Sequence, residues 1–161
     1  MKISVAWKGI SDVTRTLHDM GDRVDDASYE GAKRAAEIIQ EQARVNTRQF
    51  LEWTGRLADS IVTDDPVRVG PYSYRSRTYP AGGESPGTPY GRIQELGGVI
   101  VAHNPSGFLW WEGFRADGSF GLIAKRSVTL KPRPYLAPAL LESRSAIAAE
   151  MASVWGQAIE I

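Results

Sequence analysis

A long amphipathic segment constrains the fold of this chain more than any other feature. Over residues 22–48, apolar side chains recur at steps of three or four, which places them on one stripe of an α-helix. At 1.5 Å per residue such a helix is about 40 Å long, which is long for one small domain. Many positions of the stripe are alanine, so a neighbouring element can approach closely; its members are Val24, Ala27, Ala32, Ala35, Ile38, Ile39 and Ala43.

Shorter elements are expected before this helix and at the end of the chain. The sequence predicts a strand over Ile3 to Trp7 and a short helix over Ser11 to Asp19, and Gly21 is expected to end that helix. Residues 136–158 predict a C-terminal helix, because Pro138 suits a first helical turn, where its missing N–H costs nothing. The apolar stripe of that helix consists of Leu136, Leu140, Ile147, Met151, Val154 and Ala158.

The middle of the chain, residues 61–133, predicts β-structure with long loops. Residues 80–89 have no periodicity and more Gly and Pro than one turn needs, which predicts a mobile loop. Asp117-Gly118 lies between two apolar runs, a strong signal for a hairpin over residues 108–124. We therefore expect one α+β domain over residues 1–161. Its small antiparallel sheet would pack on the long helix and the C-terminal helix, and the hairpin would protrude.

Composition excludes several classes of function. The chain has no cysteine, and so no disulfide, thiolate zinc site or cysteine nucleophile. His18 and His103 are too few for a three-ligand metal centre, and Ser119 lies in a Gly-Ser-Phe-Gly stretch that is one residue short of a nucleophile elbow. No run approaches the roughly 20 apolar residues that span a bilayer. We expect no catalytic, metal or cofactor site and no membrane partner; an enzyme using His103 or Ser119 is the weakest alternative.

Charge is partitioned along the chain, although 19 Lys+Arg balance 19 Asp+Glu overall. Residues 1–65 carry 9 basic and 12 acidic side chains, residues 66–133 carry 9 and 4, and residues 134–161 carry 1 and 3. A basic middle and acidic helices favour head-to-tail contacts between copies, or a passage that attracts nucleic acid through its phosphates. The residues that would face DNA are Arg68, Arg75, Arg77, Lys125, Arg126 and Lys131.

Aromatic side chains gather on the predicted hairpin. The group consists of Phe108, Trp110, Trp111, Phe114 and Phe120. A single hairpin cannot bury all of them by itself. They either cover the core of the domain or form an interface patch, since aromatic residues are enriched at interface anchors. Both interpretations stay open, and under the second one Trp110, Trp111 and Phe114 are the candidate contact residues.

Three segments, taken in order, resemble a family of tailed-phage proteins. Residues 54–61 read Thr-Gly-Arg-Leu-Ala-Asp-Ser-Ile, and residues 90–98 read Tyr-Gly-Arg-Ile-Gln-Glu-Leu-Gly-Gly. Residues 131–140 read Lys-Pro-Arg-Pro-Tyr-Leu-Ala-Pro-Ala-Leu. Together they resemble the head–tail joining proteins of the gene-product-ten-like family, related in role to the lambda tail-completion protein Z. Against the pattern of that family, Gly91 replaces alanine, Tyr135 replaces phenylalanine, and residues 99–125 form an extended insertion.

The resemblance implies a virion protein of the phage neck, assembled in the host cytoplasm, with no catalysis and no cofactor. It implies a six-fold homo-oligomeric ring that completes the tail end and joins it to the head. Its neighbours would be a head-side connector or stopper protein and a tail terminator or tail tube protein, and its bore could contact genomic DNA non-specifically. A tail terminator that caps the tube is an alternative of the same class. A nucleic-acid-binding module that uses the basic residues is an alternative of another class.

The same segments supply further candidate contact residues, namely Thr54, Arg56, Glu95, Arg133 and Tyr135. The alternative is that these residues only hold the fold. We expect Thr54 to cap a short helical turn and Gly55 to permit a tight exit from the long helix. Glu95 lies in an otherwise apolar stretch and needs a partner, for which Arg133 or Arg56 is the candidate.

Overall fold

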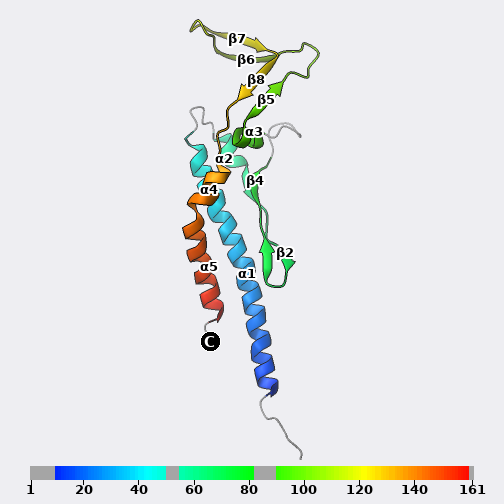
Figure 1. The fold of residues 1–161 in the computed structure, drawn as a ribbon, viewed down its shortest axis with the longest axis vertical. Coiled ribbons are helices and arrows are strands. Elements are labelled where there is room, and N and C mark those ends of the chain that lie inside the picture. The colour runs from blue at the N-terminus through cyan, green and yellow to red at the C-terminus, as the bar shows by residue number, and fades with distance from the viewer. Residues whose placement is uncertain (1–9, 50–54, 82–89, 160–161) are drawn as a thin grey trace, which may run out of the picture.

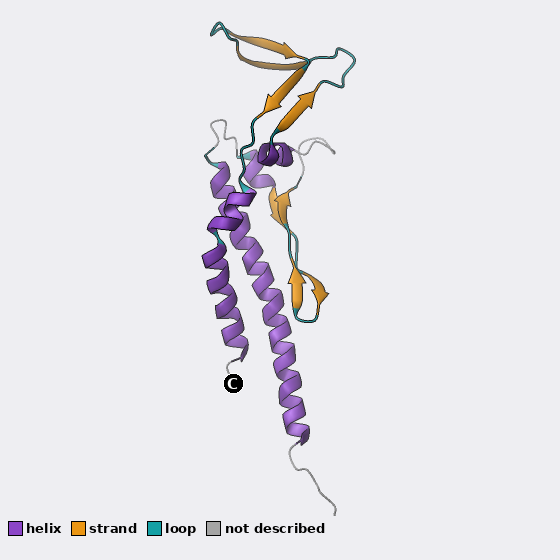
Figure 2. Cartoon of the chain, in the orientation of Figure 1, coloured by secondary structure: helices purple, strands orange, loops and turns teal. Residues whose placement is uncertain are grey.

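The computed structural model describes residues 10–49, 55–81 and 90–159 of the chain. The strand predicted over Ile3 to Trp7, the residue Thr54 and most of the loop predicted over 80–89 lie outside these ranges. The described residues form an α+β fold, as predicted, with one long helix, a C-terminal helical pair and small antiparallel ladders (Figure 2).

The long helix α1 spans Ile10–Thr47 and forms the axis of the molecule (Figure 1). Its 38 residues give a length of about 57 Å. The prediction that Gly21 ends a first helix was wrong, because the helix runs through this position. A glycine inside a helix costs only about 1 kcal/mol, which a helix of ten turns can absorb. Gly21 also lies against the β-structure, since a Cβ there would be 3.2 Å from the hydroxyl of Tyr72.

The predicted C-terminal helix is divided in two by Ser143. Helix α4 spans Leu136–Glu142 with Pro138 in its first turn, and α5 spans Arg144–Ile159 and runs back along α1 (Figure 1). The helices α1 and α5 approach closely at Gly31, where a Cβ would lie 2.7 Å from the sulfur of Met151. Gly31, which the predicted stripe did not include, therefore allows the close approach of the two helices.

The strands pair as four separate two-stranded antiparallel ladders. Two of them run along α1: β1 (Ile61–Thr63) with β4 (Thr78–Pro80), and β2 (Val67–Gly70) with β3 (Ser73–Arg75). The other two are β5 (Gly98–Val101) with β8 (Ser127–Leu130), and β6 (Leu109–Phe114) with β7 (Phe120–Lys125). The short helices α2 (Arg56–Ser60) and α3 (Tyr90–Leu96) complete the described elements.

Residues 98–130 form an arm that projects beyond the C-terminal end of α1 (Figure 1). Within it, β6 and β7 are the predicted hairpin, paired from Leu109↔Lys125 to Phe114↔Phe120, so that prediction is confirmed. Gly118 adopts a φ of 82° in the turn, a left-handed conformation that favours glycine. The β5–β8 ladder, which the sequence did not indicate, forms the base of the arm.

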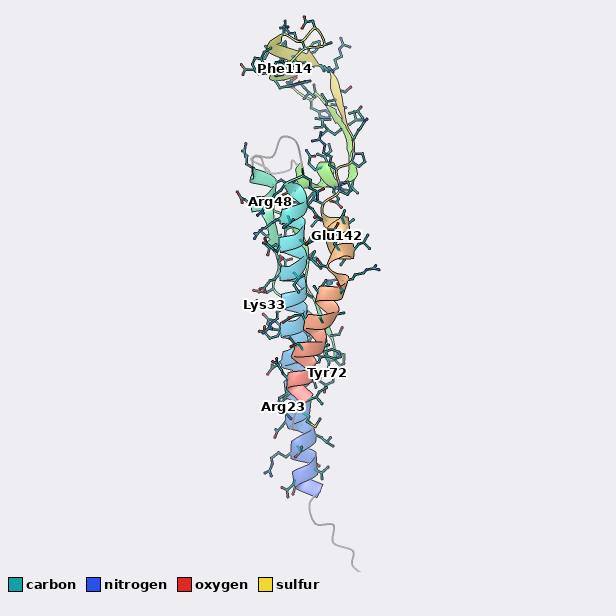
Figure 3. The ribbon with its side chains drawn as sticks, turned by 90° about the vertical axis from the view of Figure 1, so that its left-hand side faces the viewer. Arg23, Lys33, Arg48, Tyr72, Phe114 and Glu142 are labelled. Atoms are coloured by element: carbon teal, nitrogen blue, oxygen red, sulfur yellow. The ribbon has the colours of Figure 1, made fainter. Side chains whose placement is uncertain are left out.

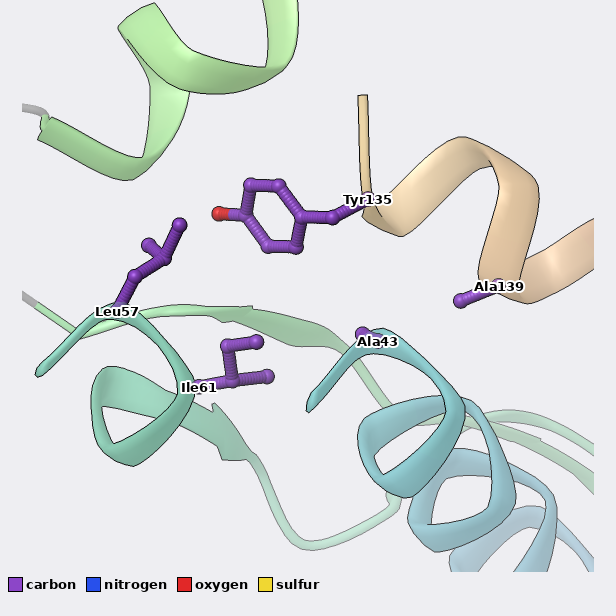
Figure 4. Close-up of a cluster of buried hydrophobic side chains, with 5 residues drawn as sticks. All are labelled: Ala43, Leu57, Ile61, Tyr135 and Ala139. Carbon is purple, nitrogen blue, oxygen red and sulfur yellow. The ribbon is translucent and has the colours of Figure 1, made fainter. Parts of the chain in front are cut away.

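The hydrophobic core is small and lies where α1, α2, β1 and α4 meet. It consists of Ala43, Leu57, Ile61, Tyr135 and Ala139 (Figure 4). The described elements are spread along one long axis (Figure 1), and large apolar side chains from α1, from the arm and from α5 remain exposed.

Candidate functional site

The three segments that carry the family resemblance converge on one junction at the base of the arm. The first contributes Leu57 and Ile61 to the core, and the third contributes Tyr135 and Ala139. The second segment forms α3, and its residue Gln94 accepts a hydrogen bond at 2.7 Å from the backbone amide of Arg133. Segments about 40 residues apart in sequence thus form one structural unit, which we call the junction.

Glu95 joins α3 to α4 in the junction. Its Oε2 accepts hydrogen bonds from the backbone amides of Tyr135 at 2.7 Å and Leu136 at 2.9 Å, and its Oε1 accepts one from Ala137 at 2.9 Å. The first amides of a helix have no partner within the helix, and a carboxylate there also complements the helix dipole. The prediction that Arg133 or Arg56 is the partner of Glu95 was therefore wrong. Glu95 accepts its hydrogen bonds from backbone amides at the start of α4. Both arginine side chains are exposed.

Tyr135 is fully buried, with 0% of its surface exposed. It offers no surface to a partner, so its expected role as a contact residue is corrected to a role in the core. Burial is the main cause that raises the pKa of its phenol, with the nearby Glu95 carboxylate as a second cause. Gly91 leaves room for this ring, since a Cβ there would lie 2.2 Å from Cγ of Pro80 and 2.8 Å from the hydroxyl of Tyr135. The alanine of the family pattern does not fit here without a shift.

Both strands of the arm leave from this junction. Gly97, with a φ of 68°, turns the chain from α3 into β5, and a Cβ there would lie 2.8 Å from the carbonyl oxygen of Leu130. Gly98 pairs with Leu130, so the two ends of the arm are side by side. The junction therefore fixes the base of the arm at two points, through α3 on one strand and α4 on the other.

The β6–β7 hairpin presents an apolar face to solvent. The alternation of the strands places Trp110, Phe114, Phe120 and Leu122 on this face, with exposed fractions of 54%, 75%, 63% and 54%. Glu112 lies on the same face, opposite Leu122, as its one acidic side chain. The rings of Phe114 and Phe120 meet edge to face, with centroids 5.4 Å apart. Trp111 lies on the opposite, half-buried face. No residue of the core cluster belongs to the arm, so the structure favours the patch over the interpretation that the aromatic residues cover the core.

The six basic residues expected to face DNA do not form one surface. Arg68, Arg75 and Arg77 lie on or between the strands beside α1, whereas Lys125, Arg126 and Lys131 belong to the arm and its base (Figure 1). Two of the first group already bind acidic groups of their own chain. Arg68 donates to Asp25, and Arg77 donates to Asp64 at 3.0 and 3.2 Å.

The Arg68 cluster connects the β2–β3 hairpin to α1. The hydroxyl of Tyr74 donates to Asp25 Oδ2 at 2.8 Å, and Arg68 donates to the same hydroxyl at 2.9 Å. The ring of Tyr74 also meets Tyr29 of α1 edge to face, at 5.6 Å between centroids. Burial and the hydrogen bond to Asp25 raise the pKa of Tyr74. These contacts hold the hairpin against the helix.

The residues considered for catalysis lie apart from one another. His18 is exposed near the start of α1, and His103 is exposed in the loop after β5. Ser119 belongs to the hairpin turn, where its hydroxyl donates to Asp117 at 2.6 Å. Among the described residues, no three His, Cys, Asp or Glu side chains are placed to hold one metal ion. No helix in the described ranges has the length and apolarity needed to cross a membrane.

Comparisons with protein-family models, with curated proteins and with solved structures find no match to this chain. The function is therefore inferred from the junction, the arm and the order of the three segments.

Proposed function

We propose that this protein is a structural subunit of the neck of a tailed phage. Copies of the chain would form a homo-oligomeric ring that completes the tail end and joins it to the head connector. The observation that carries the proposal is the arm: a two-ladder projection, anchored at its base, that bears an exposed apolar face on a chain with a small core. Such a face is typical of a surface that another protein covers.

The surface of the chain supports an assembled state. Large apolar side chains of α1, of the arm and of α5 are exposed, and stable interfaces bury about 1,200–2,000 Å² in total. A subunit whose contact surfaces lie at different places makes head-to-tail contacts, which close into rings when the rotation permits.

The order of the three segments supports the position in the neck. In the proposal, their residues build the junction that orients the arm, and the head-side connector or stopper and the tail terminator or tail tube are the axial neighbours. Any contact with DNA in the bore falls to Arg75, Lys125, Arg126 and Lys131, because Arg68 and Arg77 are engaged by Asp25 and Asp64. Six-fold symmetry belongs to the same proposal.

A phage deleted for this protein tests the proposal. The expected result is an accumulation of DNA-filled heads and separate finished tails, with joining restored when the purified protein is added to the lysate. The matched control is the same deletion complemented from a plasmid. Infectious particles with heads joined to tails in the absence of this protein would contradict the proposal.

A further inference from the structure

The turn of the β6–β7 hairpin contains an aspartate followed directly by a glycine, Asp117-Gly118. This is the single Asp-Gly pair of the sequence, which has no Asn-Gly pair. The turn follows Phe114, which lies at the opposite end of the molecule from Arg23 (Figure 3). Every residue from 115 to 120 is exposed, so solvent reaches the main chain of the pair.

An Asp-Gly pair can rearrange its own main chain. The amide nitrogen of the glycine attacks Cγ of the protonated aspartate, and the hydroxyl of the carboxyl group leaves with the amide proton as water. The product is a succinimide ring. Water then opens the ring: attack at Cγ restores aspartate, whereas attack at the main-chain carbonyl carbon leaves the chain running through Cγ, which is isoaspartate. One water leaves and one is taken up, so no other reactant is needed.

The surroundings of Gly118 leave room for this ring. A glycine has no side chain to hinder the attack of its nitrogen. Gly118 has a φ of 82°, and nothing lies within 4 Å of the position that a Cβ would take there. Ring closure therefore meets no neighbouring atom on that side of the turn.

The folded turn holds both reacting groups. The amide of Gly118 donates to the carbonyl oxygen of Arg115 at 3.0 Å. Oδ1 of Asp117 accepts hydrogen bonds from the hydroxyl of Ser119 at 2.6 Å and from its amide at 2.9 Å. These two bonds, the hydroxyl first, lower the pKa of Asp117 and favour the carboxylate over the protonated acid. Since the protonated acid is the form that loses water, the turn slows the reaction.

We propose that Asp117-Gly118 is the site at which this chain converts to isoaspartate, and that the side chain of Ser119 sets the rate by holding the Asp117 carboxylate. The substrate is the chain itself, and the modification needs no enzyme. The inference goes beyond the proposed function and does not depend on it, because one isolated copy contains every group that takes part.

The conversion changes the tip of the arm. Isoaspartate adds one carbon atom to the main chain inside the turn. Two bonds close this turn, from the Gly118 amide to the Arg115 carbonyl and from the Arg115 amide to the Ser119 carbonyl at 2.8 Å. A longer main chain cannot keep both bonds, so the edge-to-face contact of Phe114 with Phe120 is lost. The core is unaffected, because none of its residues belongs to the arm.

Peptide mapping of the full chain, aged at neutral pH, tests the proposal. Trypsin cuts after Arg115 and Lys125, so the pair lies in one peptide, residues 116–125. Its isoaspartate form has the same mass, separates by chromatography and resists the protease that cuts before aspartate. We expect faster accumulation in urea than in the folded parent. Folded Ser119→Ala is expected to react about tenfold faster than the folded parent, because the carboxylate loses one hydrogen bond.

Two variants serve as controls. Ser119→Thr keeps the hydroxyl and is expected to react at the rate of the parent. Asp117→Glu is expected to give no product, because glutamate would have to close a larger ring. A parent chain that forms no isoaspartate at position 117 even in urea would overturn the site. Equal rates for folded Ser119→Ala and the folded parent would overturn the role of Ser119. Neither result bears on the proposed ring, since neither measurement depends on association between copies.

Discussion

The carboxylate of Glu95 accepts a hydrogen bond from the backbone amide of Tyr135 at 2.7 Å, which fixes the start of α4 to the end of α3. The change Glu95→Ala is expected to lower the free energy of unfolding by about 1–3 kcal/mol, because three helix-start amides lose their acceptor. Glu95→Gln, which keeps one carbonyl acceptor, is expected to lose less. Urea unfolding measures both, and Asp26→Asn, an exposed acid of α1, is the control. Equal stability of Glu95→Ala and the parent would contradict this role.

The glycine at position 91 is expected to be essential for packing. Gly91→Ala places a Cβ 2.2 Å from Cγ of Pro80, so the neighbours must shift, and overpacking of this kind costs about 1–3 kcal/mol. The control is Gly156→Ala in α5, where nothing lies within 4 Å of the new Cβ. That control is expected to stabilise the chain by about 0.5–1 kcal/mol through helix propensity. Thermal unfolding of the two variants is the measurement, and an unchanged Gly91→Ala would show that the junction is looser than described.

The apolar face of the arm is expected to serve assembly and not folding. Trp110→Ser together with Phe114→Ser should reduce self-association at least tenfold in native mass spectra, because two aromatic side chains of the exposed hairpin face are lost. The free energy of unfolding should change by less than about 0.5 kcal/mol, as for other exposed positions. Leu17→Ser, a similarly exposed site on α1, is the control for general loss of apolar surface. A doubly substituted chain that no longer folds would place these side chains in the core instead.

Alkaline pH is expected to destabilise the protein through Tyr135. Its pKa is raised in the folded state, so above the ordinary tyrosine value of about 10 the native chain holds a proton that the unfolded chain releases. The stability contribution of this group is complete below pH 10 and is lost as the pH rises further, since the native state binds more protons. Tyr135→Phe should reduce the loss of unfolding free energy between pH 8 and 11. Urea unfolding measures this loss, relative to the stability of each variant at neutral pH. Tyr72→Phe, in an exposed turn, is the control, and identical slopes for Tyr135→Phe and the parent would refute the assignment.

The parts of the fold with strong local signals were predictable from the sequence. The 3.6-residue period of the α1 stripe and the Asp117-Gly118 turn gave the long helix and the β6–β7 hairpin, both of which depend on neighbours in sequence. The start of α1 was predicted wrongly because Gly21 commonly ends a helix and Asp22 commonly caps the start of the next one. The cooperativity of a 38-residue helix overrides these local preferences.

The candidate site was less predictable, because its parts are far apart in sequence. A carboxylate in an apolar stretch suggests an arginine partner, but the amides that Glu95 contacts belong to a helix start 40 residues away. The ladder of β5 and β8 joins two short strands across the whole arm, with no turn signal between them. The open pocket beside α1 is lined by residues of α1, α3, α4, β3 and β4 and has no sequence motif. Only the packing of the folded chain brings these residues together.

The most direct test of the central claim is electron microscopy of the phage neck with this chain located in the density by its α1–α5 pair and its arm. The expected result is a closed ring of copies between the head connector and the tail, with neighbouring copies in contact. A neck that contains no copy of the chain, or copies that touch no other copy, would contradict the claim.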